Sequence, residues 1–438
     1  MKISVFLLLA GSAFAGVEDS FLLKNVTVHP VSGPEAAGTM VLVKDGKIAA
    51  VGPKLTADKG TKVIDGKGGH VWPGMINSAT ELGLQEISSV RETVDTGEIG
   101  AFNPQLRALI AVNPESEFIP VTRANGISMA MTMPSTGTTG GPRQAGTPSI
   151  IPGQVALIHL SGWTWEEMEV RRAAALQIVF PTIETRTFNF FEMGPGRSPY
   201  TEAKKFFDKQ VKDLNDYFDQ ARAYQKAKAA GSKDFQTNLA LEAMIPVLEG
   251  KEPVVVFASV ERTIKAALEF IVKQKIKAIL ANVRRPGAQL AEIQKRGIPV
   301  IVGDVTDLPE QEDDAYDKNY SLAAELHKAG IKFAFGTFDN QFARNLPFQA
   351  GIAVGYGLPP AAAIKAVTLG AAEIWGVEKE YGSIEAGKWA DLVLTDGDLL
   401  EHRTQVKAMW IKGHSTSLEN KHTDLYQKYM SRPDGPTK

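Results

Sequence analysis

Short apolar runs alternate with amphipathic helical patterns through most of this chain, and that alternation limits the possible folds most strongly. The helical patterns cover residues 263–273, 288–295 and 322–329. Apolar runs of this length are typical of strands buried on both faces of a parallel sheet. The runs lie at 71–76, 127–133, 155–160, 254–258, 278–281, 298–302 and 331–335. Repeated strand–helix alternation over residues 71–375 therefore predicts a (β/α) barrel.

Both ends of the chain carry strand patterns of a different kind. Residues 20–73 contain alternating apolar runs separated by turn signals such as Lys44-Asp45-Gly46, and residues 382–413 return to strands. Strands on both sides of one barrel indicate that the two ends pair into a single small β domain. We predict that 17–70 and 376–415 form this domain, 71–375 the barrel and 416–438 a C-terminal tail. A charged helix over 200–230 is expected on the barrel's rim.

The first residues read as a targeting segment. Lys2 precedes an apolar run over 3–10, and Ala13-Phe14-Ala15 fits the small-x-small cleavage pattern. We predict a signal peptide over residues 1–15 and an exported protein, periplasmic or secreted. The run is about half of the roughly 20 apolar residues that span a bilayer, and no later segment is long and apolar enough, so no membrane span is expected.

Composition excludes several classes of function. Lys plus Arg number 48 and Asp plus Glu number 50, which gives a formal net charge of −2. A nucleic-acid binder normally carries a basic excess, so none is expected as a partner. The chain has no cysteine, which excludes disulfide scaffolds, iron–sulfur sites and cysteine nucleophiles.

Four segments resemble the metal-dependent amidohydrolase superfamily, in the order that the family shows. Residues 71–83 (VWPGMINSATELG) resemble its first barrel strand, and residues 381–393 (YGSIEAGKWADLV) resemble its exit from the barrel. Residues 369–377 and the hairpin around 43–52 are also similar to the family pattern. Exported imidazolonepropionase-like proteins resemble the chain most. The resemblance implies a distorted TIM (β/α)8 barrel with a small composite β-sandwich formed by both chain ends.

The resemblance also implies a metal-assisted hydrolysis. In this superfamily one or two divalent ions activate a water that attacks an amide, lactam or imine carbon. Two His on the first strand, one His each near the ends of strands five and six, and an Asp ending strand eight hold the ions. The Asp also serves as general base.

Most of these ligands are missing at the matching positions. Ala79 and Glu81 stand where the family has its His-x-His pair, and the strand-five segment ends around Phe257. The strand-six segment, residues 279–282, contains no His either, while Asp339 matches the family's strand-eight Asp. We therefore predict a degenerate site with no resident metal, in which Asp339 is the candidate catalytic residue. Two carboxylates, Glu81 and Asp339, leave open an altered site for a hard cation such as Mg²⁺ or Ca²⁺.

Other side chains offer limited replacements. No two of the seven histidines are one, three or four residues apart, the spacings that place a pair on one side of a strand or helix. His159 ends a predicted strand and is the best single candidate among them. We predict Glu81, His159 and Asn340 as substrate-binding residues, with Glu81 and Asp339 facing one cavity.

These residues leave alternative functions. In the first, the protein is a pseudoenzyme that binds a small molecule or assembles with copies of itself or with an active paralogue. In the second, it hydrolyses non-peptide C–N bonds of a cyclic amide or imidazolone-like substrate, with Asp339 as general base. The first is favoured, because the roughly nine-unit fall in water's pKa has no source without a metal. A lone general base contributes only about 10²–10⁴-fold. An exported binding protein of unrelated fold is a third hypothesis.

Overall fold

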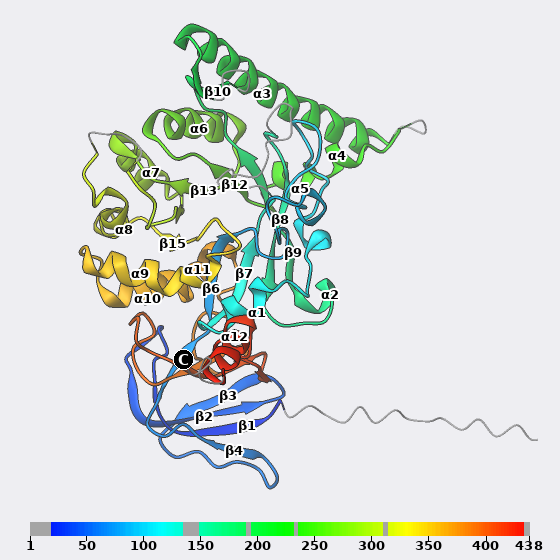
Figure 1. Cartoon of the computed structure of the whole chain (residues 1–438). Helices are drawn as coiled ribbons and strands as arrows, with labels where there is room; N and C mark the ends of the chain where they lie inside the picture. The colour runs from blue at the N-terminus through cyan, green and yellow to red at the C-terminus, as the bar shows by residue number, and fades with distance from the viewer. Residues whose placement is uncertain (1–18, 135–148, 190–193, 232–234, 310–313, 433–438) are drawn as a thin grey trace, which may run out of the picture.

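Strands from both ends of the chain form one sheet in the computed structural model, which describes residues 19–134, 149–189, 194–231, 235–309 and 314–432 (Figure 1). The sheet runs in the order β18-β17-β16-β5-β1-β2-β3, with β4 also paired to β1. Its strands are β1 (Phe21–Val28), β2 (Ala36–Lys44), β3 (Lys47–Gly52), β4 (Lys62–Asp65), β5 (His70–Pro73), β16 (Leu392–Thr395), β17 (Val406–Ile411) and β18 (His414–Thr416). The antiparallel pairing of β16 with β5 joins the two ends, as predicted. The predicted signal peptide lies outside the described residues.

The predicted first barrel strand is divided between two sheets. Residues 71–73 belong to β5 in the small sheet, whereas the barrel begins with β6 (Met75–Thr80). Gly74 separates them, and a Cβ atom there would lie 2.3 Å from the Ser128 hydroxyl oxygen. A larger residue would force Ser128 to move, so glycine suits this close approach at the passage from one domain into the other.

A second sheet of eight strands curls into a nearly closed barrel. It runs β15-β14-β13-β12-β9-β8-β7-β6. Its further strands are β7 (Ile127–Thr132), β8 (Gly153–His159), β9 (Glu169–Val179), β12 (Val254–Phe257), β13 (Ala278–Val283), β14 (Val300–Val302) and β15 (Phe333–Phe335). At the closure, the backbone N–H of Phe338 donates to the carbonyl of Ala79 at 2.8 Å. The expected distorted TIM-type barrel is confirmed.

One strand runs against the others. β8 is antiparallel to both β7 and β9, whereas the remaining pairings in this sheet are parallel. The expectation of parallel strands throughout is therefore wrong for residues 153–159. The carboxyl end of β8 lies at the opposite end of the barrel from the carboxyl ends of its neighbours.

The helices cover the outside of the barrel, except α12, which lies beside β17 and β18 of the small sheet. They are α1 (Phe118–Arg123), α2 (Trp165–Met168), α3 (Tyr200–Ala230), α4 (Leu239–Glu242), α5 (Ile245–Leu248), α6 (Glu261–Gln274), α7 (Leu290–Arg296), α8 (Lys318–Lys328), α9 (Leu346–Gly355), α10 (Pro360–Val367), α11 (Leu369–Trp375) and α12 (Lys421–Met430). The long helix α3 lies along the outer edge beyond α6, next to the hairpin β10 (Arg186–Asn189) and β11 (Gly194–Arg197) (Figure 1). Phe218 of α3 packs edge-to-face on Phe270 of α6 with ring centroids 5.2 Å apart. Within the described residues, no helix is long and apolar enough to cross a membrane.

Alternate strand residues enter two separate cores. Val254, Val256, Val300 and Val302 pack with the surrounding helices. Their neighbours face the barrel interior and form a second apolar cluster, because successive strand residues point to opposite sides. That cluster contains Ile76, Ala79, Met129, Met131, Val255, Phe257, Ile279, Ala281, Ile301, Ala334 and Phe338. The barrel interior is thus filled with side chains.

Candidate active site at the barrel mouth

Two aromatic rings fill the interior where β12 and β15 end. Phe257 closes β12 and is 5% exposed, and Phe338 follows β15 and is 1% exposed. Their rings meet edge-to-face with centroids 5.7 Å apart. Both belong to the same buried cluster as Ala79, which lies near the end of β6. Sites in this fold lie at the carboxyl ends of the parallel strands, which we call the barrel mouth. The rings of Phe257 and Phe338 therefore occupy the place of such a site, and we call this pair the aromatic plug.

An unusual backbone conformation places the second ring. Phe338 has a φ of 53°, in the left-handed region that bulky residues rarely adopt. Such strain costs on the order of 1–3 kcal/mol and persists only when surrounding contacts hold it. Burial of the ring and the hydrogen bond from its N–H to Ala79 supply those contacts.

The next two residues support the loop that follows. One carboxylate oxygen of Asp339 accepts a hydrogen bond from the backbone N–H of Phe342 at 2.6 Å. The amide of Asn340 is 3% exposed and donates to the carbonyl of Gln85 at 2.6 Å. Both side chains therefore have structural partners on this face of the barrel. Their catalytic and substrate-binding roles stay predictions.

Glu81 is completely buried directly after β6. Its backbone carbonyl accepts from the N–H of Leu84 at 3.0 Å, which starts the loop over this side of the mouth. That Glu81 and Asp339 face a common cavity stays a prediction.

His159 lies at the other end of the barrel. It ends the antiparallel strand β8 and pairs with Met129, near the start of β7. Its Nε2 atom is 3.4 Å from a carboxylate oxygen of Asp391, and its ring meets Tyr381 edge-on at 5.3 Å. The side chains of His159 and Asp391 are only 1% and 4% exposed. The structure does not bring His159 together with Asp339, because the direction of β8 places it against the small domain.

Two positions at the mouth, which the resemblance assigns to histidine ligands, carry side chains that cannot bind a divalent metal. Alanine and phenylalanine offer no ligand atom at the positions of Ala79 and Phe257. At the end of β13, the side-chain oxygen of Asn282 already accepts from Nε of Arg284 at 3.1 Å. Across the described ranges, no three His, Cys, Asp or Glu side chains converge on a point where an ion would be held.

A polar cluster after β14 was not singled out in the sequence. Asp304 accepts hydrogen bonds from the side-chain amide of Gln349 at 2.9 Å and from the backbone N–H of Thr306 at 2.8 Å. Burial is the largest cause that raises the pKa of the Asp304 carboxyl. Gln349 is 1% exposed, and its amide oxygen has no hydrogen-bond partner among the residues that the structure describes. A charged residue two positions after an apolar run was the available signal.

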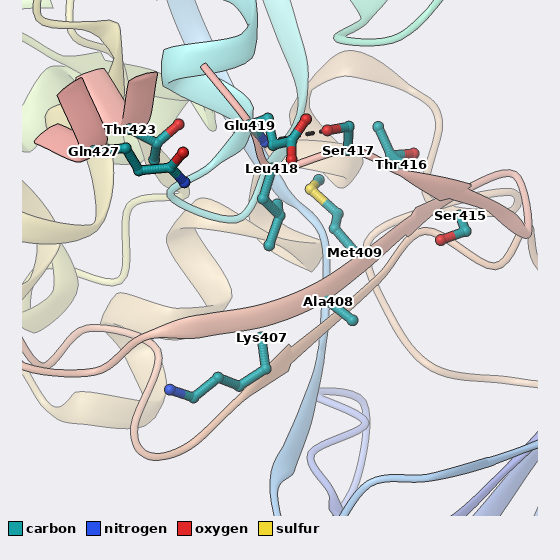
Figure 2. A pocket seen from close by; sticks show the side chains of 10 residues that line it. All are labelled: Lys407, Ala408, Met409, Ser415, Thr416, Ser417, Leu418, Glu419, Thr423 and Gln427. Atoms are coloured by element: carbon teal, nitrogen blue, oxygen red, sulfur yellow. Dashed lines mark hydrogen bonds between the residues drawn. The ribbon is translucent and has the colours of Figure 1, made fainter. Parts of the chain in front are cut away.

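A separate hollow of about 530 Å³ lies on the small sheet, between β17, β18 and α12 (Figure 2). Figure 2 shows Met409, Leu418, Thr423 and Gln427 among the side chains that line it. The small sheet joins the barrel at the amino end of β6, so this hollow is remote from the mouth.

Comparisons with known proteins agree with this architecture. A sequence profile described as the amidohydrolase family matches residues 254–416. The chain is 22% identical over 429 residues to the amidohydrolase tasK of Hapsidospora irregularis, covering 90% of this chain and 42% of that protein. It thus spans about two fifths of that relative's length.

Solved structures show the same fold. An amidohydrolase from Thermotoga maritima MSB8 superposes with a TM-score of 0.77 at 24% identity, over 91% of this chain and 99% of that one. A putative prolidase from Bifidobacterium longum gives a TM-score of 0.54 at 17% identity, over 94% and 100% of the two chains.

Proposed function

We propose that the chain is a member of the amidohydrolase superfamily that lacks metal-dependent hydrolysis and acts as a binding or assembly subunit. The family profile over residues 254–416, the amidohydrolase relative and the shared fold support this proposal. The ligand of the chain would be a small molecule, and its partner a second copy or an active paralogue. The predicted signal peptide would take this activity outside the cytoplasm.

The aromatic plug carries the proposal. Phe257 and Phe338 fill the mouth together with Ala79. Burying one such ring contributes roughly 1.5–3 kcal/mol, so a metal with its water would have to displace a stabilising part of the core. A fold tolerates this exchange because its stability lies in apolar packing, whereas its activity lies in side chains placed on the scaffold.

The polar cluster after β14 supports a binding role. Asp304 and Gln349 lie on the face where ligands of this fold bind, and within the described part of the chain no donor reaches the amide oxygen of Gln349. Buried polar groups are normally paired, so an unpaired acceptor suits a ligand or water that donates a hydrogen bond.

Metal analysis tests the proposal directly. The full chain would be produced with zinc, iron and manganese in the medium, dialysed and analysed by plasma mass spectrometry. We expect less than about one tenth of an equivalent of any of these metals, following from the lack of donors. One equivalent of any of them, held against dialysis, would contradict the proposal.

An activity measurement separates the altered hydrolase. Asp339→Asn keeps an oxygen that accepts from the N–H of Phe342, so its melting temperature should stay within a few degrees. We expect the same background hydrolysis of cyclic amides in this variant and in the wild type. A clear rate in the wild type that the variant loses would establish Asp339 as a catalytic base.

A further inference from the structure

Two histidines from different parts of the small sheet share a hydrogen bond. His29 directly follows β1, and His70 opens β5, the parallel neighbour of β1. Nε2 of His29 lies 2.9 Å from Nδ1 of His70. The ring of Trp72 stacks on His29 with centroids 3.6 Å apart and planes 5° apart, so His29 cannot turn away freely.

This hydrogen bond depends on the protonation of the pair. One nitrogen must donate and the other must offer a lone pair, so at least one ring is neutral. If both rings were protonated, two N–H groups and two positive charges would face each other at that distance. The pair can therefore hold one proton beyond neutrality but not two.

The surroundings of His29 are mixed in charge. His70 faces His29 from β5, and Asp398, which follows β16, also acts on its charge. Glu35 lies on the same β1–β2 connection as His29, with one carboxylate oxygen 3.4 Å from Nδ1 of His29. Burial is the largest cause that lowers the pKa of His29, and the charge of His70 lowers it further, while the two carboxylates oppose them. The neutral ring is thus favoured at neutral pH.

The connection from β1 to β2 is held in a strained conformation next to this pair. Val31 has a φ of 69°, a genuine outlier for a β-branched residue. The backbone N–H of His29 donates to the carbonyl of Val71 at 2.9 Å, and the N–H of Ile384 donates to the carbonyl of Pro30 at 3.2 Å. The second bond reaches the segment that leads from the barrel back into the small sheet.

We propose that His29 and His70 form an acid-sensitive latch, which holds the connection 29–35 on the small sheet at neutral pH and releases it when both rings are protonated. Release removes the support of the strained Val31 and loosens the contact between Pro30 and Ile384. The latch places a pH-dependent step at the junction of the two domains.

Hydrogen exchange on the full chain tests this latch. Protection of the N–H groups of His29 and Ile384, corrected for the intrinsic rate, should fall at least tenfold between pH 7.5 and pH 5.0. His70→Gln keeps a hydrogen-bonding side chain that cannot become charged, so the fall should disappear in that variant. His422→Gln, on the exposed helix α12, serves as the matched control and should behave as the wild type. An equal fall in His70→Gln, or none in the wild type, would overturn the proposal.

A second measurement does not depend on exchange. With histidine labelled at Cε1, the signal of His29 should titrate at lower pH in the wild type than in His70→Gln, because the variant lacks the facing charge. Identical midpoints in the two proteins would show that the rings do not sense each other.

Discussion

Replacing Glu252 by glutamine should make the protein more stable at alkaline pH. Glu252 lies just before β12 and is 8% exposed, and none of the described residues hydrogen-bonds to one of its carboxylate oxygens. Burial raises the pKa of this carboxyl from 4.5 to about 7, although the charge of Arg107 lowers it somewhat. Ionisation is thus unfavourable in the folded chain.

The sign of the pH dependence follows from this shift. Between pH 4.5 and about 7 the folded chain binds more protons at Glu252 than the unfolded chain. The free energy of unfolding that this proton contributes is fully present below pH 4.5 and is lost as pH rises through about 7. At 1.36 kcal/mol per pKa unit, the shift is worth about 3 kcal/mol.

Urea unfolding at several pH values measures this effect. The Glu252→Gln variant stays neutral, so we expect its midpoint to exceed that of the wild type at pH 8 by up to the equivalent of about 3 kcal/mol. The two midpoints should converge towards pH 4.5. Glu249→Gln is a matched control on the exposed surface nearby, and it should show no gain at pH 8. A difference between Glu252→Gln and wild type that does not change with pH would refute the reasoning.

Two further substitutions test the packing at the barrel mouth. Phe257→Ala should lower the free energy of unfolding by about 3–5 kcal/mol. Because the two rings touch, the double variant with Phe338→Ala should lose less stability than the sum of the losses in the two single variants. Urea midpoints of the two single variants and the double variant give this coupling, and strict additivity would contradict it. Asn77→Ala should cost about 2–4 kcal/mol, because its buried amide donates to the Thr337 hydroxyl and the Ala343 carbonyl and accepts from the Thr337 N–H. Unfolding followed by circular dichroism measures it, and a loss below about 0.5 kcal/mol would show that those hydrogen bonds contribute little.

Local patterns in the sequence predicted the fold class and many of the helices and strands, although β9 and α9 were not among them. The helix α3 occupies the predicted residues 200–230, and the apolar runs at 254–258 and 278–281 became β12 and β13. The spacing of apolar residues shows whether a segment is buried on one face or on both. This spacing can be read from residues that are close in sequence. The lack of His at the positions of Ala79 and Phe257 was equally plain in the sequence.

Strand direction and long-range packing were decided only by the tertiary structure. An apolar run looks the same whichever way its strand points, so the sequence indicated that His159 lies at the barrel mouth. The antiparallel strand β8 instead places it at the opposite end of the barrel. The inward turn of Phe338, the raised pKa of Glu252 and the pairing of His29 with His70 all arise from residues distant in sequence. The sequence by itself determined which segments are buried and which residue types stand at each position. The folded chain alone decided which side chains meet, because burial and charge at a site are set by neighbours that no local pattern records.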